Sequence, residues 1–186
     1  FPVLFVNDRQ INDSYIIFKS LAPILFGKPY SEEDVKLEEL ITYGLLLACE
    51  KEAFGGVENM KRWSAVAGLT HVTGFLVRNL APLSLAQKAA DRVASRYPHL
   101  KTSLEYCQEL KEALDQRGTP FFAGEQAGAL DASCYGALCV WHAGGEESME
   151  FAKEAVTQSG LDPWFERTRA AIPSVFDLQG WWPLYT

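Results

Sequence analysis

The apolar residues of this 186-residue chain change their spacing once, close to residue 13. Before that point they form two short runs, the first from Pro2 to Val6, which are separated by the turn-forming pair Asn7-Asp8. From about Asp34 to Ile172 they recur at the spacing of an α-helix. The sequence therefore predicts two short strands followed by an all-helical body. More than two strands beyond residue 34 would contradict this prediction.

Glycine, proline and capping residues divide the helical region. The first helix is expected over 14–21, followed by a linker over 22–30 that contains Pro23. Ser31 and the three acidic residues after it begin a long helix, which ends at Gly55-Gly56. The other helices are expected over 63–80, 84–97, 98–117, 128–142, 147–159 and 162–172.

Composition excludes several classes of protein. The net charge of −7 leaves no basic surface for nucleic acid phosphates, so no nucleic acid partner is expected. The longest apolar run, Ile41 to Cys49, has about half the roughly 20 residues that a membrane-spanning helix needs. No transmembrane segment is therefore predicted, and the 48% of hydrophobic residues indicates a globular protein.

The cysteines and histidines do not form a recognisable site. The four cysteines are Cys49, Cys107, Cys134 and Cys139. Their spacing fits neither a CxxC motif nor a zinc site, and all four lie in apolar helical contexts. They are expected to be free thiols in a reducing compartment, such as the interior of an organelle or the surface of an organellar membrane complex. The histidines lie singly, so no metal site is predicted (His71, His99 and His142).

The N-terminal residues carry the first resemblance to a known family. A proline opens the first strand, and Asn12-Asp13-Ser14 caps a helix that begins near Tyr15. This pattern resembles the second half of the thioredoxin-like domain of glutathione transferases. The resemblance implies that the backbone of Phe1 and Pro2 meets the cysteinyl amide of glutathione, and that Asp13 and Ser14 bind its glutamyl end. Ser14 is also a plausible plain helix cap, and the sequence leaves the two roles open.

A second resemblance lies in residues 120–136, which are similar to the helix-capping module of the same family. Ordinarily a Ser, Thr or Asn precedes an Asp by three residues there. In this chain Asp131 takes the Asp role, and Gly128, which helix N-caps tolerate, replaces the side-chain cap. Both residues are therefore predicted to be structural, and Asp131→Ala is expected to cost roughly 1–2 kcal/mol.

Four segments, in the same order, are similar to the membrane-associated prostaglandin E synthase type 2 subgroup of this family: 11–14, 54–58, 131–136 and 162–172. The resemblance implies a mainly α fold, in which a partial thioredoxin-like ββα remnant precedes an all-helical glutathione-transferase C-terminal domain. The expected divisions are 1–30 for the remnant and linker, 31–172 for the helical domain and 173–186 for an aromatic tail.

The same subgroup carries a CxxC motif and binds glutathione and haem, but this chain departs from that pattern. It has no CxxC, and a shorter segment, Ala22 to Leu40, replaces the family's insertion near the haem. No cofactor is therefore expected; glutathione is the one that the resemblance allows, and haem is not supported.

The tail contains Trp181, Trp182 and Tyr185 in a segment broken by Gly180 and Pro183. These side chains are unfavourable in water. Two interpretations stay open: they fold back onto the helical domain, or they anchor a protein partner.

Two functions are compatible with these residues. In the preferred one, the chain is a non-catalytic accessory or interaction subunit of a larger assembly, with no catalytic residue of its own, whose open strand edges a protein partner covers. In the alternative, it belongs to a glutathione-dependent thiol isomerase or transferase whose CxxC segment precedes residue 1. A homo-oligomer is compatible with both.

Overall fold

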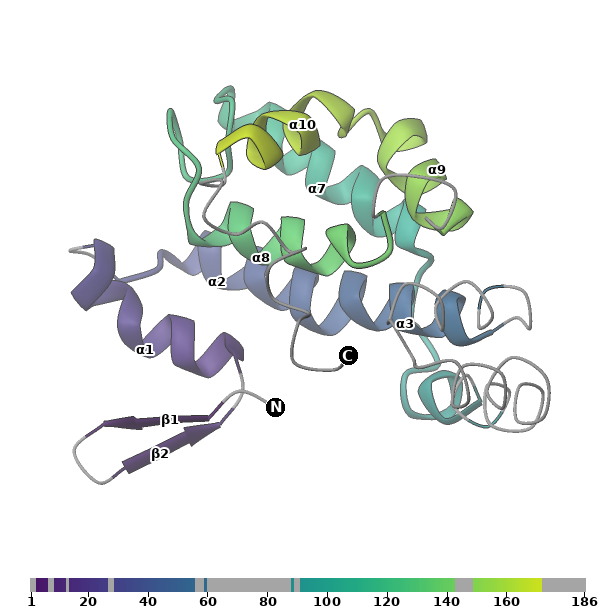
Figure 1. Ribbon diagram of the computed structural model, residues 1–186, viewed down its shortest axis with the longest axis horizontal. Helices are drawn as coiled ribbons and strands as arrows, with labels where there is room; N and C mark the ends of the chain where they lie inside the picture. Colours follow the sequence, from purple (N-terminus) through teal and green to yellow (C-terminus); the bar gives the residue numbers. More distant parts are fainter. Residues whose placement is uncertain are drawn as a thin grey trace, which may run out of the picture.

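A computed structural model of the chain describes residues 3–6, 9–12, 14–26, 29–55, 59, 88, 91–142 and 149–171. These residues form a mainly helical structure with one two-stranded antiparallel sheet (Figure 1), which confirms the predicted succession of strands and helices. Beyond residue 34, the described part of the chain contains no further strand, only an isolated bridge between Phe121 and Gly124. The thioredoxin-like and glutathione-transferase character of the two parts remains a prediction.

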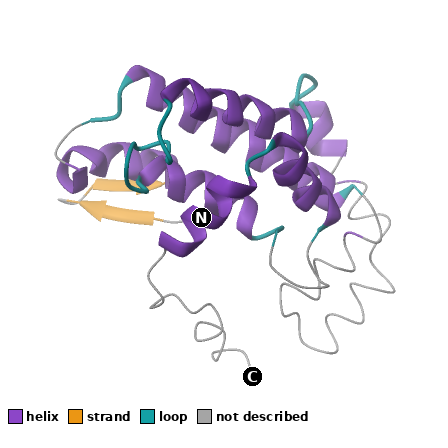
Figure 2. Ribbon diagram, turned by 90° about the horizontal axis from the view of Figure 1, so that it is seen from above, coloured by secondary structure: helices purple, strands orange, loops and turns teal. Residues whose placement is uncertain are grey.

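The N-terminal unit consists of a hairpin and one helix. Strands β1 (Val3–Val6) and β2 (Arg9–Asn12) pair antiparallel, with Val3 opposite Asn12, and α1 (Ser14–Phe26) packs against them (Figure 2). The prediction that this helix ends near residue 21 is wrong, because α1 continues through Pro23. Pro23 is exposed and removes only one amide donor, so the apolar residues that follow it remain helical.

One long helix, predicted as a single α-helix, forms the centre of the body. It begins at Ser31, whose hydroxyl accepts a hydrogen bond from the Asp34 amide while the Asp34 carboxylate accepts one from the Ser31 amide. It ends at Gly55. Its middle, however, is a turn of π-helix, which the sequence did not predict. The three parts are α2 (Glu32–Glu39), η1 (Leu40–Leu45) and α3 (Leu46–Phe54).

Within η1, Gly44 allows a close approach to a second helix. A Cβ atom at Gly44 would lie 2.5 Å from Cε1 of Tyr106, a residue of α7 (Ser103–Arg117). The Tyr106 ring therefore packs directly on the backbone of the π-helix, and both residues are buried.

We expect Gly44→Ala to destabilise the protein by about 1–3 kcal/mol, because the added methyl group would overlap the Tyr106 ring. Gly136→Ala is the matched control: Gly136 is an exposed position in a helix, and its added Cβ would meet nothing within 4 Å. The control should raise stability by about 0.5–1 kcal/mol, since alanine has the higher helix propensity. Thermal or urea unfolding of the two variants measures both effects, and a stabilised Gly44→Ala protein would contradict the described packing.

The remaining helices follow caps in the sequence. The predicted start of α7 at residue 98 is wrong, because Thr102 and Glu105 form a capping box that begins the helix at Ser103. Gly118 and Gly160 end α7 and α9 in the left-handed conformation. Residues 91–96 are helical, whereas the helix expected over 63–80 lies outside the described residues. The other helices are α8 (Ala129–Cys139), α9 (Glu150–Ser159) and α10 (Asp162–Ala171).

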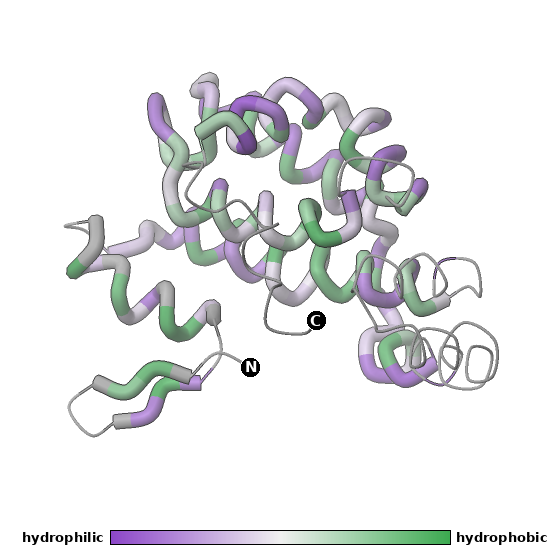
Figure 3. Tube along the Cα trace, in the orientation of Figure 1, coloured by the Kyte–Doolittle hydropathy of each residue, from purple (hydrophilic) through white to green (hydrophobic). Residues whose placement is uncertain are grey.

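The core lies where the long central helix, α7 and α8 meet, with α9 and α10 packed on the far side of α7 and α8 (Figure 1). Figure 3 shows that hydrophobic residues recur along these helices, and also along β1 and α1. The bulkiest fully buried apolar side chains are Trp164, Phe122, Ile41, Leu45, Leu110, Leu138, Met149 and Leu161.

Candidate functional site

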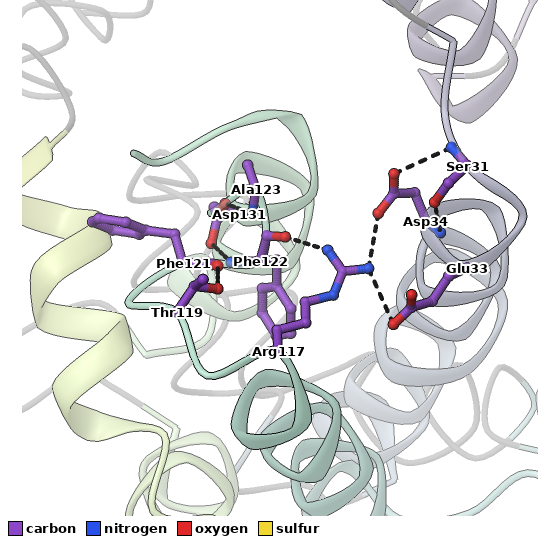
Figure 4. Close-up of polar contacts among 9 residues, drawn as sticks. All are labelled: Ser31, Glu33, Asp34, Arg117, Thr119, Phe121, Phe122, Ala123 and Asp131. Carbon is purple, nitrogen blue, oxygen red and sulfur yellow. Dashed lines mark hydrogen bonds and ion pairs between the residues drawn. The ribbon is translucent and has the colours of Figure 1, made fainter. Parts of the chain in front are cut away.

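Asp131, in the first turn of α8, is the centre of a buried polar network (Figure 4). Its side chain is fully buried and accepts three backbone hydrogen bonds, from the amides of Phe122 (2.9 Å), Ala123 (3.1 Å) and Gly128 (3.0 Å). A fourth hydrogen bond, of 2.8 Å, comes from the indole Nε1 of Trp164 on α10. One carboxylate therefore fixes the loop that precedes α8 and connects it to α10.

Gly128, the N-cap of α8, has a more specific role than the cap replacement expected from the sequence. Its backbone is extended, at φ −133° and ψ −160°, so no left-handed conformation requires glycine. A Cβ atom here would instead lie 2.4 Å from the Cβ of Ala123. Glycine is needed because the loop folds tightly onto the start of the helix.

Arg117, at the end of α7, connects this loop to the start of α2 (Figure 4). Its Nη2 lies 2.8 Å from the Oδ1 of Asp34 and 3.5 Å from the Oε1 of Glu33, and its Nη1 donates a hydrogen bond to the carbonyl oxygen of Phe122. Partial burial tends to raise the pKa of Asp34, but hydrogen bonds from Arg117 and Ser31 outweigh it and lower that pKa.

A pocket of about 290 Å³ adjoins this ion pair. Its lining is mostly apolar and comes from the start of α2, the end of α7 and the loop before α8. Two buried polar atoms of lining residues, the Tyr30 hydroxyl and the Arg117 Nε, have no hydrogen-bond partner among the described residues. Burial, followed by the nearby charges of Glu38 and Asp34, raises the pKa of Tyr30, so this phenol stays protonated. The pocket is lined by Pro29, Tyr30, Asp34, Arg117, Phe122, Ala123, Ala127, Gly128, Ala129 and Leu130.

Two further acids connect helices. Glu38 is only 1% exposed, and its Oε1 accepts hydrogen bonds from Ser133 (2.6 Å) on α8 and Thr42 (3.2 Å). Burial raises the pKa of Glu38, and its Oε2 has no partner in the described part of the chain. Glu52 of α3 accepts hydrogen bonds from the amide (2.8 Å) and hydroxyl (2.6 Å) of Ser103, and so stabilises the start of α7. These contacts hold α2 to α8 and α3 to α7.

The cysteines are free thiols. Cys49, Cys107 and Cys134 are buried and Cys139 is half-buried. Burial raises the pKa of all four, that of Cys107 to about 12, so none is a thiolate at neutral pH.

Three of the five large hydrophobic side chains that are exposed among the described residues lie on the N-terminal unit. Phe5 on β1 is 68% exposed and Ile24 on α1 is 75% exposed, and Ile16 is also exposed on α1. This unit contacts the body through Tyr15, which is buried and whose ring meets that of Tyr43 edge-on at 6.0 Å. Among the described side chains of this unit, Phe5, Ile16 and Ile24 therefore face solvent.

Several residues singled out from the sequence lie outside the described part. These are Phe1, Pro2, Asp13, His71, Trp181, Trp182 and Tyr185. Ser14 is the first residue of α1, and only its backbone is described. The expected glutathione-binding side chains therefore lie outside what the structure describes, and their role stays a prediction.

The described residues contain neither a group of metal ligands nor a membrane-spanning helix. No three of their His, Cys, Asp and Glu side chains are grouped as metal ligands. The ring of the half-buried His142 packs on Phe165, with 4.4 Å between ring centroids, and burial lowers its pKa. None of the helices within the described ranges is long and apolar enough to cross a membrane.

Sequence reasoning missed Arg117 and Glu38. A detectable pattern existed for Glu38, which precedes Ile41 by three residues and Leu45 by seven and so lies on the apolar face of its helix. No local pattern marks Arg117, because its ion-pair partner Asp34 lies 83 positions away in the sequence.

Comparison with known proteins identifies no relative: no protein-family model and no curated protein matches this chain.

Proposed function

We propose that this chain is a non-catalytic accessory subunit of a larger assembly, in which a glutathione-transferase-like helical body carries a hairpin–helix unit that binds a protein partner. The observation that carries the proposal is the exposure of Phe5 and Ile24 on that unit.

The hairpin is the part of the described structure whose stability a bound partner would increase most. A two-stranded hairpin is marginally stable in water unless further strands or helices cover it, and α1 covers one of its faces. Outer strand edges are also natural positions for pairing with another chain. Burying Phe5 and Ile24 would contribute about 1.5–3 kcal/mol for each side chain.

The polar network of the body supports the same function. Asp131 uses its carboxylate to fix a loop, and Arg117 connects three segments. The buried cysteines are protonated thiols, which suits structural residues rather than nucleophiles. These are properties of a rigid scaffold.

The test replaces the apolar surface and leaves the body intact. We expect the double variant Phe5→Asp/Ile24→Asp to keep the melting temperature of the wild-type body and to lose its native assembly, measured by light scattering and by co-purification of tagged protein from its source. Val140→Asp is the matched control, because Val140 is 51% exposed on the body, at the end of α8. An assembly that survives the double variant, or is lost equally in the control, would refute the proposal.

The thiol-enzyme alternative has its own assay. Glutathione binding at micromolar concentration that is abolished by Ser14→Ala would favour that alternative over an accessory subunit.

A further inference from the structure

A second pocket, shallow and open to solvent, lies where η1 meets the first turn of α7, separate from the Asp131 network; we refer to it as the cavity. Its volume is about 330 Å³, at the lower end of the range for small-molecule sites. Three tyrosines, Tyr43, Tyr97 and Tyr106, supply its aromatic walls. The cavity is lined in addition by Arg96, Pro98, His99 and Leu100.

The lining is basic although the protein is acidic. Arg96 and His99 contribute cationic or proton-binding groups and no lining residue is acidic, whereas the whole chain has a net charge of −7. The Arg96 guanidinium lies 5.8 Å from the centroid of the Tyr97 ring and forms no ion pair with another described residue. In contrast, Lys101, just outside the cavity, is paired with Glu109. The N–H donors of the Arg96 guanidinium are therefore available to hydrogen-bond an anion.

The π-helix contributes to one wall of the cavity. Within the six residues of η1, Tyr43 is exposed and lines the cavity, while Gly44 lets the Tyr106 ring lie against the helix backbone. A π-turn is rare in helices and is frequent at functional sites. Two of the three aromatic walls thus belong to the π-turn or pack directly on it.

We propose that this cavity binds a small planar or aromatic anion, whose carboxylate or phosphate group pairs with Arg96 and whose ring packs between the tyrosines. Aromatic side chains stack on planar rings of many kinds, so the tyrosines would bind the ring of the ligand. The positive charge of the Arg96 guanidinium would favour ligands that are negatively charged. This site goes beyond the proposed accessory function, because it requires no partner and lies on the helical body.

The test uses three probes of one shape: 1-naphthoate, 1-naphthyl phosphate and the neutral 1-naphthamide, each titrated into the full chain and followed by ligand-observed NMR. We expect at least one of the two anions to bind about fivefold more tightly than the amide. Arg96→Gln should abolish that preference, and Arg92→Gln, which removes an exposed charge from the same helical segment, should leave it unchanged. Tyr97→Ala should weaken all three probes.

Each result decides the question. Absence of binding by every probe, equal binding of the anions and the amide, or equal effects of the Arg96 and Arg92 variants would overturn the proposal. Loss of preference in the Arg96 variant alone would support it. The anion that binds more tightly then identifies a carboxylate or a phosphate as the group recognised.

Discussion

Asp131→Ala should lower the free energy of unfolding by about 4 kcal/mol, because the change leaves four donors without their acceptor and each buried, unsatisfied donor costs about 1–3 kcal/mol. Water can reach the partly exposed amides of Ala123 and Gly128, so the sum is smaller than four full penalties. The Phe122 amide and the Trp164 indole are buried and carry most of the loss. This expectation is larger than the sequence alone supports, since the bond from Trp164 could not be foreseen.

Urea unfolding followed by tryptophan fluorescence measures this effect. The matched control is Asp115→Ala, which removes an acid from the exposed side of α7 and should change stability by less than about 1 kcal/mol. A loss in Asp131→Ala no greater than that of the control would show that the network contributes nothing to stability.

Arg117→Met should cost about 2–3 kcal/mol, the second-largest effect expected. The methionine retains the apolar part of the side chain but leaves Oδ1 of Asp34 and the carbonyl oxygen of Phe122 without the donor that Arg117 supplies. Lys111→Met is the control on the same helix, because Lys111 pairs with Asp115 at the surface and should contribute less than about 1 kcal/mol.

The Arg117 effect should also depend on pH. The native pKa of Asp34 is lowered, so its ion pair stabilises the fold above the unfolded pKa, and this stability is lost as the pH falls through the native pKa. The difference between wild type and Arg117→Met should therefore be constant near neutral pH and shrink below about pH 4. Unfolding titrations at several pH values give this profile, and a difference that grows on acidification would contradict the ion pair.

Local features of the fold were predictable from the sequence, because their causes lie within a few residues. The change of apolar spacing predicted the hairpin and the helices. Gly118 marked the end of α7, and the Asp162-Pro163 pair marked the start of α10. Two predicted helix boundaries were wrong because a second local feature acted against the expected one. The apolar residues after Pro23 remain helical, so α1 continues beyond that proline, and the Thr102–Glu105 capping box places the start of α7 at Ser103.

The candidate sites were mostly beyond prediction, because they depend on contacts between distant residues. The partners Arg117 and Asp34 are 83 positions apart, and Glu38 and Ser133 are 95 apart. The π-turn also escaped detection, and the close approach of Tyr106 to Gly44 within it joins residues 62 positions apart.

The π-turn between Leu40 and Leu45 has a consequence for changes in chain length. A π-helix closes its hydrogen bonds over one residue more than an α-helix does, so η1 stores the equivalent of one surplus residue inside a continuous helix. Deleting one residue there would convert the turn to ordinary α-helix and keep α2 and α3 in line with their own neighbours. One residue can therefore be deleted from the long central helix without a compensating change in the length of a loop.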